Sequence, residues 1–413
     1  MVDETTQPRD SLESSAESDS TTHGTTPHHR RHGSQLSLPD CLDSSTDDEV
    51  STPSSTGCVQ NRQQQTKSLG GMLTNMSFPR DNRSASTHSM PTGGFSIGAL
   101  ANPTTPRITH ARMDNIVYDS KVYGESWDER RERIRKESPH GHLPGWQLFS
   151  IIVKTNDDLR QEMFTMQMMT KLKSIFEFEQ LSLWLRTYRI VATGANIGLL
   201  ETINDACSLD HLKKTFKGGN NLYEYFRATY GEPNSASFEV ARRNFIQSMA
   251  AYSIVSYVLL VKDRHNGNIL LGAEGHIIHI DFGFILGIAP GGMFSIEDAP
   301  FKLTEEMVMI MGGLSSPGYE LYRKLMCDGF LALQKYQSEI SALLQTTGQH
   351  SPFPCFEGAK LARVVSDLRG RLCVGLTKLQ IEKRVDHLIS KSYNAWGTRK
   401  YDSFQLRSNN IHP

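Results

Sequence analysis

The sequence predicts an α+β fold with two lobes, a small strand-rich lobe followed by a larger and mainly helical one. Two observations support this division. Short β-branched runs gather between residues 146 and 203, and longer patterns with helical periodicity fill most of the chain after residue 204. We therefore predict a small lobe over residues 116–203 and a large lobe over residues 204–413, preceded by a tail over residues 1–115.

The tail differs from the rest of the chain in composition. Residues 1–115 are dominated by Ser, Thr, Gly, Pro, Asn, Gln and His, with few large apolar side chains. Such a segment buries too little apolar surface to offset the conformational entropy that ordering costs. We expect it to be disordered.

The small lobe begins with a strand pattern that ends in a lysine. Residues 146–154 read as a strand ending at Lys154, and a helical pattern begins at Asp158. Glu162 falls on the apolar stripe of this helix, where a carboxylate is costly unless it is paired. We predict an ion pair between Lys154 and Glu162, the arrangement that holds a lysine for nucleotide phosphates. The alternative for either residue alone is an ordinary surface position.

In the large lobe, two apolar runs form a predicted hairpin with acidic and amide groups at its open end. Residues 268–271 and 276–280 are separated by a Gly-containing turn, so we expect them to pair antiparallel. With Gly272 opposite Gly275, Asn268 lies opposite His279, and Asn268 and Asp281 point to the same face. Amide and carboxylate oxygens suit Mg²⁺, or Mn²⁺, bound against nucleotide phosphates.

A catalytic-loop pattern precedes this hairpin. Asp263 stands five positions before Asn268, the interval between catalytic Asp and metal-binding Asn in the H-R-D-x-x-x-x-N pattern, although here the basic residues Arg264 and His265 follow the Asp. Either Asp263 or His265 accepts the proton of an attacking hydroxyl in this interpretation. In the non-catalytic alternative, Asp263 and Asp281 cap loops, and the nearby histidines are ordinary core or surface residues. This alternative is disfavoured because the Asp263 motif and the Asp281 motif occur in order around one hairpin. The motifs together predict ATP-dependent phosphoryl transfer.

These motifs, with the sequence around them, resemble those of a known kinase family. The runs Asp157-Asp-Leu-Arg-Gln-Glu162, Val261-Lys-Asp-Arg-His-Asn-Gly-Asn268 and Asp281-Phe-Gly283 resemble the phosphoinositide 3- and 4-kinase family, and within it the phosphatidylinositol 4-kinases, from about residue 126 to the C-terminus. The resemblance implies a two-lobed protein-kinase-like fold, ATP as co-substrate and phosphorylation of the 4-hydroxyl of phosphatidylinositol. It also implies that the backbone around Glu201 to Ile203 binds adenine.

The segment from Asp281 to Thr304 gives a separate indication of substrate. Lys302 is its single cation, with Glu297 and Asp298 nearby in sequence. A head group with additional phosphomonoesters needs several Arg or Lys side chains for neutralisation. We therefore expect plain phosphatidylinositol in a membrane to be the lipid, with Lys302 as the candidate substrate contact.

Charge, cysteines and hydropathy limit the other function classes. The net charge is −1, so no global field favours nucleic acid. Six cysteines without metal-binding spacing indicate reduced thiols, and the polar N-terminus shows no signal peptide. The longest apolar run, residues 249–261, is too short to span a bilayer and is predicted as a buried helix leading into the catalytic loop. We expect a cytoplasmic protein, peripheral on membranes.

By resemblance, those membranes are Golgi or endosomal, and a small GTPase and Golgi adaptor proteins are partners. The family members concerned carry a helical domain before the kinase domain, and residues 1–115 do not resemble it. Two other functions stay open. One is a protein Ser/Thr kinase of the related large-kinase group, and the other is a non-enzymatic nucleotide-binding scaffold. A scaffold is disfavoured because Lys154, Asp263 and Asp281 are all present.

Overall fold

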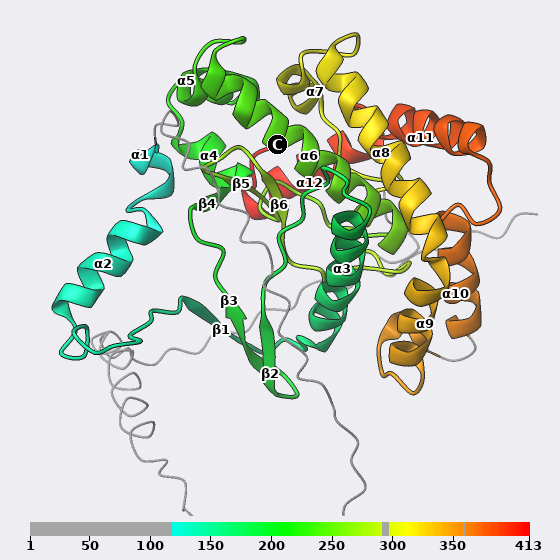
Figure 1. Cartoon of the computed structure of the whole chain (residues 1–413), viewed down its shortest axis with the longest axis horizontal. Coiled ribbons are helices and arrows are strands. Elements are labelled where there is room, and N and C mark those ends of the chain that lie inside the picture. The colour runs from blue at the N-terminus through cyan, green and yellow to red at the C-terminus, as the bar shows by residue number, and fades with distance from the viewer. Residues whose placement is uncertain (1–117, 291–296, 358–359) are drawn as a thin grey trace, which may run out of the picture. The chain divides into compact units, whose positions relative to one another are not determined.

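A computed structural model describes residues 118–290, 297–357 and 360–413, and these described residues belong to one compact unit (Figure 1). The predicted tail over residues 1–115 lies outside the described residues. Two small antiparallel sheets and a majority of helices confirm the α+β class.

The first sheet carries the predicted lysine strand. Its order is β1-β3-β2, formed by β1 (Ile151–Thr155), β3 (Ile197–Glu201) and β2 (Ile190–Gly194). β1 pairs antiparallel with β3, with Lys154 opposite Gly198. The helix α3 (Arg160–Phe178) follows β1 and packs against β2. This sheet and helix together place Lys154 beside α3.

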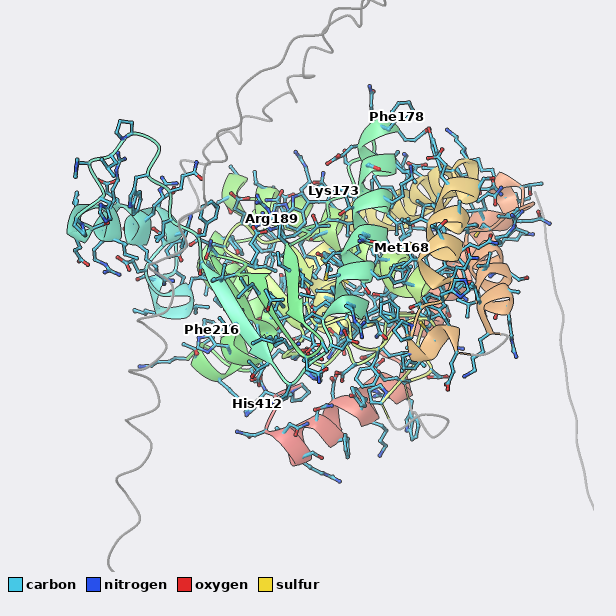
Figure 2. All side chains as sticks on the ribbon, turned by 90° about the horizontal axis from the view of Figure 1, so that it is seen from below. Met168, Lys173, Phe178, Arg189, Phe216 and His412 are labelled. Atoms are coloured by element: carbon cyan, nitrogen blue, oxygen red, sulfur yellow. The ribbon has the colours of Figure 1, made fainter. Side chains whose placement is uncertain are left out.

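The helix α3 also packs against the helical part of the molecule. It contacts α8 (Pro317–Lys335) and α9 (Gln337–Gly348) through a face that includes the fully buried Met168. Met168 lies among packed side chains in Figure 2, whereas Phe178 at the end of the helix is exposed. Met169 and Leu172, which lie on the apolar stripe predicted from the sequence, are also fully buried, so this stripe faces the core.

The second sheet contains the predicted hairpin. Its order is β4-β5-β6, formed by β4 (Ala206–Ser208), β5 (Ile269–Gly272) and β6 (Ile277–His279). The hairpin register differs by one residue from the predicted one, because His279 lies opposite Ile269 rather than Asn268.

The turn explains this shift. The backbone N–H of Gly272 donates to the carbonyl of His276 at 2.8 Å, so three residues rather than two form the connection. Gly275 has a φ of +91°, as expected for the left-handed position of a three-residue hairpin loop. A Cβ at Gly275 would lie 2.8 Å from the carbonyl oxygen of Ala241, which belongs to the helix α6 (Ala236–Leu259), so only glycine fits against this helix.

The helix α6 (Ala236–Leu259) occupies the centre of the helical part (Figure 1). It begins at the N-cap Ser235, whose side chain accepts from the N–H of Phe238, and nearly all of its second half is buried. The sequence predicted the buried second half and its direct passage into the catalytic loop. The helix packs against α8, β6 and three further helices, so it fixes the catalytic loop to the main core. These helices are α5 (Leu222–Tyr230), α7 (Glu305–Met311) and α10 (Lys360–Arg371).

The remaining helices agree with the helical periodicity that the sequence shows after residue 204. α7 (Glu305–Met311) precedes α8, and Tyr336 separates α8 from α9. The other helical elements are α1 (Ser120–Tyr123), α2 (Trp127–Glu137), α4 (Leu209–Thr215), α5 (Leu222–Tyr230), η2 (Pro354–Phe356), α10 (Lys360–Arg371), α11 (Lys378–Ser392) and α12 (Trp396–Asn409).

Among the described residues, we find no helix with the length and apolar character needed to cross a bilayer.

Candidate active site

Lys154 meets two carboxylates. Its Nζ lies 2.6 Å from Oδ2 of Asp157 and 3.9 Å from Oε2 of Glu162. The predicted partner Glu162 is therefore present, but Asp157, which the sequence did not single out, is the nearer one. Burial lowers the pKa of Lys154, but the three carboxylates of Asp157, Asp281 and Glu162 outweigh it, and the net shift is upward. The lysine is held as a cation next to the Asp281 segment.

Glu162 is a buried carboxylate with a second partner. Its side chain is nearly inaccessible to solvent and accepts a hydrogen bond from the hydroxyl of Tyr188. Burial raises the pKa of Glu162, while Tyr188 and Lys154 oppose that shift without cancelling it. Tyr188 lies 26 residues further along the chain, so no local sequence pattern indicated this contact.

Asp263 lies in a strained and well-connected loop. Its φ is +64°, in the left-handed region that costs a non-glycine residue energy. A hydrogen bond offsets this conformational cost, because the N–H of Asp263 donates to Oε2 of Glu297 at 2.8 Å. Asn268 Nδ2 donates to the backbone carbonyl of Asp263 at 3.0 Å and to its Oδ2 at 3.3 Å, and the hydroxyl of Tyr401 donates to its Oδ1. Both carboxylate oxygens are thereby oriented.

His265 lies beside Asp263 with an assignable tautomer. Its Nδ1 accepts a hydrogen bond from the N–H of Gly267 at 3.1 Å, and its Nε2 lies 3.6 Å from Oδ1 of Asp263. Burial lowers the pKa of His265, and Asp263 opposes this only in part, so the ring is neutral near pH 7. Because Nδ1 is an acceptor, the proton of the neutral ring is on Nε2 and faces Asp263.

Arg264 links the catalytic loop to the Asp281 segment. It is buried and donates to the carbonyls of Lys262 at 2.9 Å, Ile280 at 2.8 Å and Asp281 at 2.5 Å. Its guanidinium also lies over the ring of Phe282, 5.3 Å from the centroid. These contacts fit a residue that positions the two loops, rather than one that exchanges a proton.

Asn268 and Asp281 offer oxygen atoms that suit a hard cation. Since Nδ2 of Asn268 donates to Asp263, its Oδ1 is turned the other way. Asp281 is exposed, has a φ of +58°, and its carboxylate receives no hydrogen bond from another described residue. With the observed register, ideal strand alternation would place these two side chains on opposite faces. That alternation does not apply at Asp281, because β6 ends at His279 and the backbone turns at Asp281.

In the segment predicted to bind adenine, two of the three backbone N–H groups are already hydrogen-bonded within the protein. The N–H groups of Glu201 and Thr202 donate to the carbonyls of Arg189 and Ser150, at 2.8 and 3.0 Å, so they are not available to a ligand. The N–H of Ile203 makes no hydrogen bond to another described residue. Ile203 is therefore the member of this segment with a free donor.

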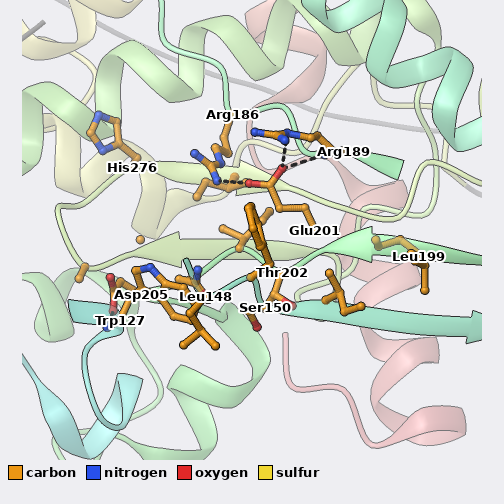
Figure 3. Close-up of a pocket in the computed structure, with 18 of the residues that line it drawn as sticks. Trp127, Leu148, Ser150, Arg186, Arg189, Leu199, Glu201, Thr202, Asp205 and His276 are labelled. Atoms are coloured by element: carbon orange, nitrogen blue, oxygen red, sulfur yellow. Dashed lines mark hydrogen bonds and ion pairs between the residues drawn. The ribbon is translucent and has the colours of Figure 1, made fainter. Parts of the chain in front are cut away.

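The side chain of Glu201 lines a pocket that does not include the predicted phosphate-binding and metal-binding residues. It accepts from Nη2 of Arg186 at 3.1 Å and from the backbone N–H of Arg189 at 3.0 Å (Figure 3). This pocket, of about 640 Å³, is also lined by Ile203 but by none of Lys154, Glu162, Asp263, Asn268 and Asp281. It is thus separate from the groups that would hold phosphates.

Lys302 does not face a substrate in this structure. Its side chain is 2% exposed, and Nζ lies 2.7 Å from Oδ1 of Asp402 on α12. Nothing in the neighbouring sequence marks this single cation as buried, but the fold pairs it with a residue of α12 one hundred positions further along the chain. We do not retain it as a substrate contact.

Several contacts at the site have no sequence signal of their own. Gln161 of α3 donates through Nε2 to the carbonyl of Gly283 at 2.5 Å, which joins α3 to the Asp281 segment. Glu297, Tyr188 and Tyr401 likewise reach the site from distant parts of the chain. Only Gln161 falls within a motif quoted from the sequence.

Comparison with known proteins gives one family model and several relatives with related names. The family model for phosphatidylinositol 3- and 4-kinase matches residues 148–358. A phosphatidylinositol 4-kinase of Dictyostelium discoideum is 43% identical over 311 residues, which cover 75% of this chain and 26% of the relative. Phosphatidylinositol 4-kinase beta 1 of Arabidopsis thaliana is 46% identical over 292 residues, covering 70% of this chain and 26% of the relative.

A vertebrate relative shows the same pattern. Phosphatidylinositol 4-kinase beta of Xenopus tropicalis is 42% identical over 287 residues, covering 70% of this chain and 35% of the relative. The chain therefore matches between about a quarter and a third of the length of these relatives.

Proposed function

Because the chain belongs to the phosphatidylinositol 3- and 4-kinase family, with the two-lobed α+β kinase fold of that family, we propose that it transfers the γ-phosphoryl group of ATP to the 4-hydroxyl of phosphatidylinositol. The observation that carries the proposal is that Arg264 joins the Asp263 loop to the Asp281 loop, beside the Lys154–Glu162 pair. The names of the relatives support the ring position that receives phosphate.

In this proposal Asp263 accepts the proton of the inositol hydroxyl that attacks ATP. The oxygen of the inositol hydroxyl attacks the γ-phosphorus, the bond from that phosphorus to the β,γ-bridging oxygen breaks, and ADP leaves with the bond electrons. Neutral His265 has its one acceptor nitrogen bonded to Gly267 and presents its Nε2–H towards Asp263. His265 is therefore better suited to orient Asp263 than to act as the base.

Lys154 neutralises phosphate charge in this proposal. Its side chain is about one-third exposed and is held by Asp157 and Glu162. Asn268 and Asp281 are the residues that would hold Mg²⁺ or Mn²⁺, because their free oxygens match the hard ligands such ions prefer. A bound ion would supply charge neutralisation at the β- and γ-phosphates. Ile203 would bind adenine through its free N–H.

The lipid is plain phosphatidylinositol in this proposal. The sequence from Asp281 to Thr304 contains Lys302 as its single Lys or Arg, and Asp402 neutralises that lysine. Additional phosphomonoesters on the ring would thus meet no free cation from this segment. We further propose peripheral contact with cytoplasmic membranes, with the Golgi or endosomes, a small GTPase and Golgi adaptors as predictions from resemblance.

A product assay tests the proposal. The full chain is incubated with radiolabelled ATP, Mg²⁺ and phosphatidylinositol vesicles, and the label on lipid is compared with the label on protein. We expect labelled phosphatidylinositol 4-phosphate, and loss of at least about a thousandfold in Asp281→Asn, since electrostatic groups at such sites contribute several kcal/mol. Label on protein alone would favour a protein kinase, and undiminished activity of Asp281→Asn would refute the site.

A further inference from the structure

Three side chains on α12 form a chain of hydrogen bonds that ends on Asp263. Asn409 Nδ2 donates to Oε1 of Gln405 at 2.6 Å, and Gln405 Nε2 donates to the hydroxyl oxygen of Tyr401 at 2.8 Å. The hydroxyl of Tyr401 in turn donates to Oδ1 of Asp263. The spacing of four residues places the three side chains on one face of the helix.

The direction of each bond follows from the chemistry of its groups. An ionised Asp263 carboxylate only accepts, so Tyr401 must donate to it. The oxygen of Tyr401 is then the acceptor for Gln405, which must present its amide NH₂ there and its carbonyl to Asn409. The three bonds are mutually consistent in one orientation, which is the condition under which such networks strengthen their members.

We propose that Tyr401 is a positioning residue for Asp263, with Gln405 and Asn409 holding its hydroxyl in the donating orientation. This inference rests on the proposed function, because it assigns Asp263 as the base. Asn268 holds one carboxylate oxygen and Tyr401 holds the other. Two donors on two oxygens fix the plane of the carboxylate.

α12 is anchored firmly enough for this role. The buried pair between Lys302 and Asp402 lies directly beside Tyr401 in sequence. Beyond the helix, Asn266 Nδ2 donates to the carbonyl of His412 at 2.9 Å, and the N–H of His412 donates to Oδ1 of Asp210 at 2.7 Å. His412 is thus bonded both to the catalytic loop and to Asp210, a residue of the helix over residues 209–215.

The protonation state of Tyr401 suits a permanent donor. Tyr401 is 7% exposed, and burial followed by its bond to Asp263 raises its pKa well above the ordinary value. The hydroxyl therefore keeps its proton throughout the neutral range and stays a donor to Asp263.

The test compares three variants of the full chain in phosphatidylinositol vesicles. Tyr401→Phe removes only the hydroxyl. Gln405→Glu replaces the donor to Tyr401 by a carboxylate, which would attract the Tyr401 proton away from Asp263. Ser403→Ala is the matched control, because Ser403 is exposed on the same helix and its hydroxyl donates to the carbonyl of Arg399. We measure kcat, the KM for ATP and the urea midpoint of each.

We expect kcat to fall about ten- to a hundredfold in Tyr401→Phe and in Gln405→Glu, since small displacements of a catalytic group have effects of this size. The KM for ATP and the behaviour of Ser403→Ala should stay unchanged. Combining Tyr401→Phe with Gln405→Glu should cost no more than either alone, because both break the same bond to Asp263.

Two outcomes would overturn the inference. The first is an unchanged kcat in Tyr401→Phe while Asp263→Asn is inactive, which would reject the role of α12 but leave the proposed function intact. The second is a loss of activity that follows the urea midpoint in every variant, because α12 would then be only structural. Full activity of Asp263→Asn would instead contradict the proposed function itself.

Discussion

The Nζ of Lys154 lies 3.9 Å from Oε2 of Glu162, although the two residues belong to different elements, β1 and α3. The first prediction concerns this pair. Lys154→Met should lower kcat by roughly three powers of ten, because the variant loses the cation that neutralises phosphate. Phosphatidylinositol kinase assays measure this, with Lys173→Met, an exposed position on α3, as the control. Equal loss in both variants would contradict the assignment.

The second prediction concerns pH. Glu162 must be ionised to pair with Lys154, and its pKa is already raised, chiefly by burial, with Tyr188 opposing the shift. Tyr188→Phe removes that opposition, so the pKa of Glu162 should rise further. As the pH falls, Glu162 is then protonated and the pair is broken at a higher pH than in the parent chain. The acid limb of the pH–activity profile should therefore move to higher pH.

The measurement is kcat against pH for the parent chain, Tyr188→Phe and Tyr223→Phe. Tyr223 is a partly buried tyrosine on α5 that lies outside the site, so its variant should keep the parent profile. An acid limb that moves to lower pH in Tyr188→Phe would contradict the proposed link between Tyr188 and Glu162.

The third prediction concerns the buried pair between Lys302 and Asp402. Asp402→Asn leaves an uncompensated lysine in the interior, which should lower the free energy of unfolding by about 3–5 kcal/mol. Asp386→Asn removes a surface partner of Arg323, so its effect should be below about 1 kcal/mol. Urea unfolding measures both. Similar, small effects of the two substitutions would show that Lys302 finds another partner or solvent.

The fourth prediction concerns membrane contact through α12. Trp396 and Phe404 are 63% and 54% exposed, while Tyr401 between them is buried against the catalytic loop. The helix is therefore docked by one face and presents aromatic side chains on another, a composition that suits a membrane interface. The double variant Trp396→Ala with Phe404→Ala should bind anionic vesicles several-fold more weakly and retain ATP binding.

Phe178→Ala provides the control, because Phe178 is an aromatic residue with an even larger exposed fraction, 76%, at the end of α3, at the opposite edge of the molecule from α12 in Figure 2. Co-sedimentation with vesicles measures binding. A similar loss in Phe178→Ala would mean that general surface hydrophobicity, not α12, supports the contact. Deleting every residue after Ser392 is less informative, since it also removes Tyr401 from Asp263.

Local patterns account for most of the elements and for the pairing of Lys154 with Glu162. Strand, turn and helix signals depend on residues that are neighbours in sequence, and a carboxylate on an apolar helical stripe requires a nearby cation. The one-residue error in the hairpin register has a tertiary cause. The close approach of Gly275 to Ala241 on α6 fixed the turn, and that helix is not part of the hairpin pattern.

From its sequence alone, the protein's kinase motifs, their order and the helical character of the large lobe were determined, because each depends on short-range spacing. The tertiary structure decided which side chains serve them. It buried Lys302 against Asp402, turned Glu201 away to Arg186, and brought Tyr401 to Asp263 across 138 residues. The contacts of Asp402 and Tyr401 arise because α12 packs against segments that are distant in sequence. Packing between distant segments leaves no periodic mark in either one.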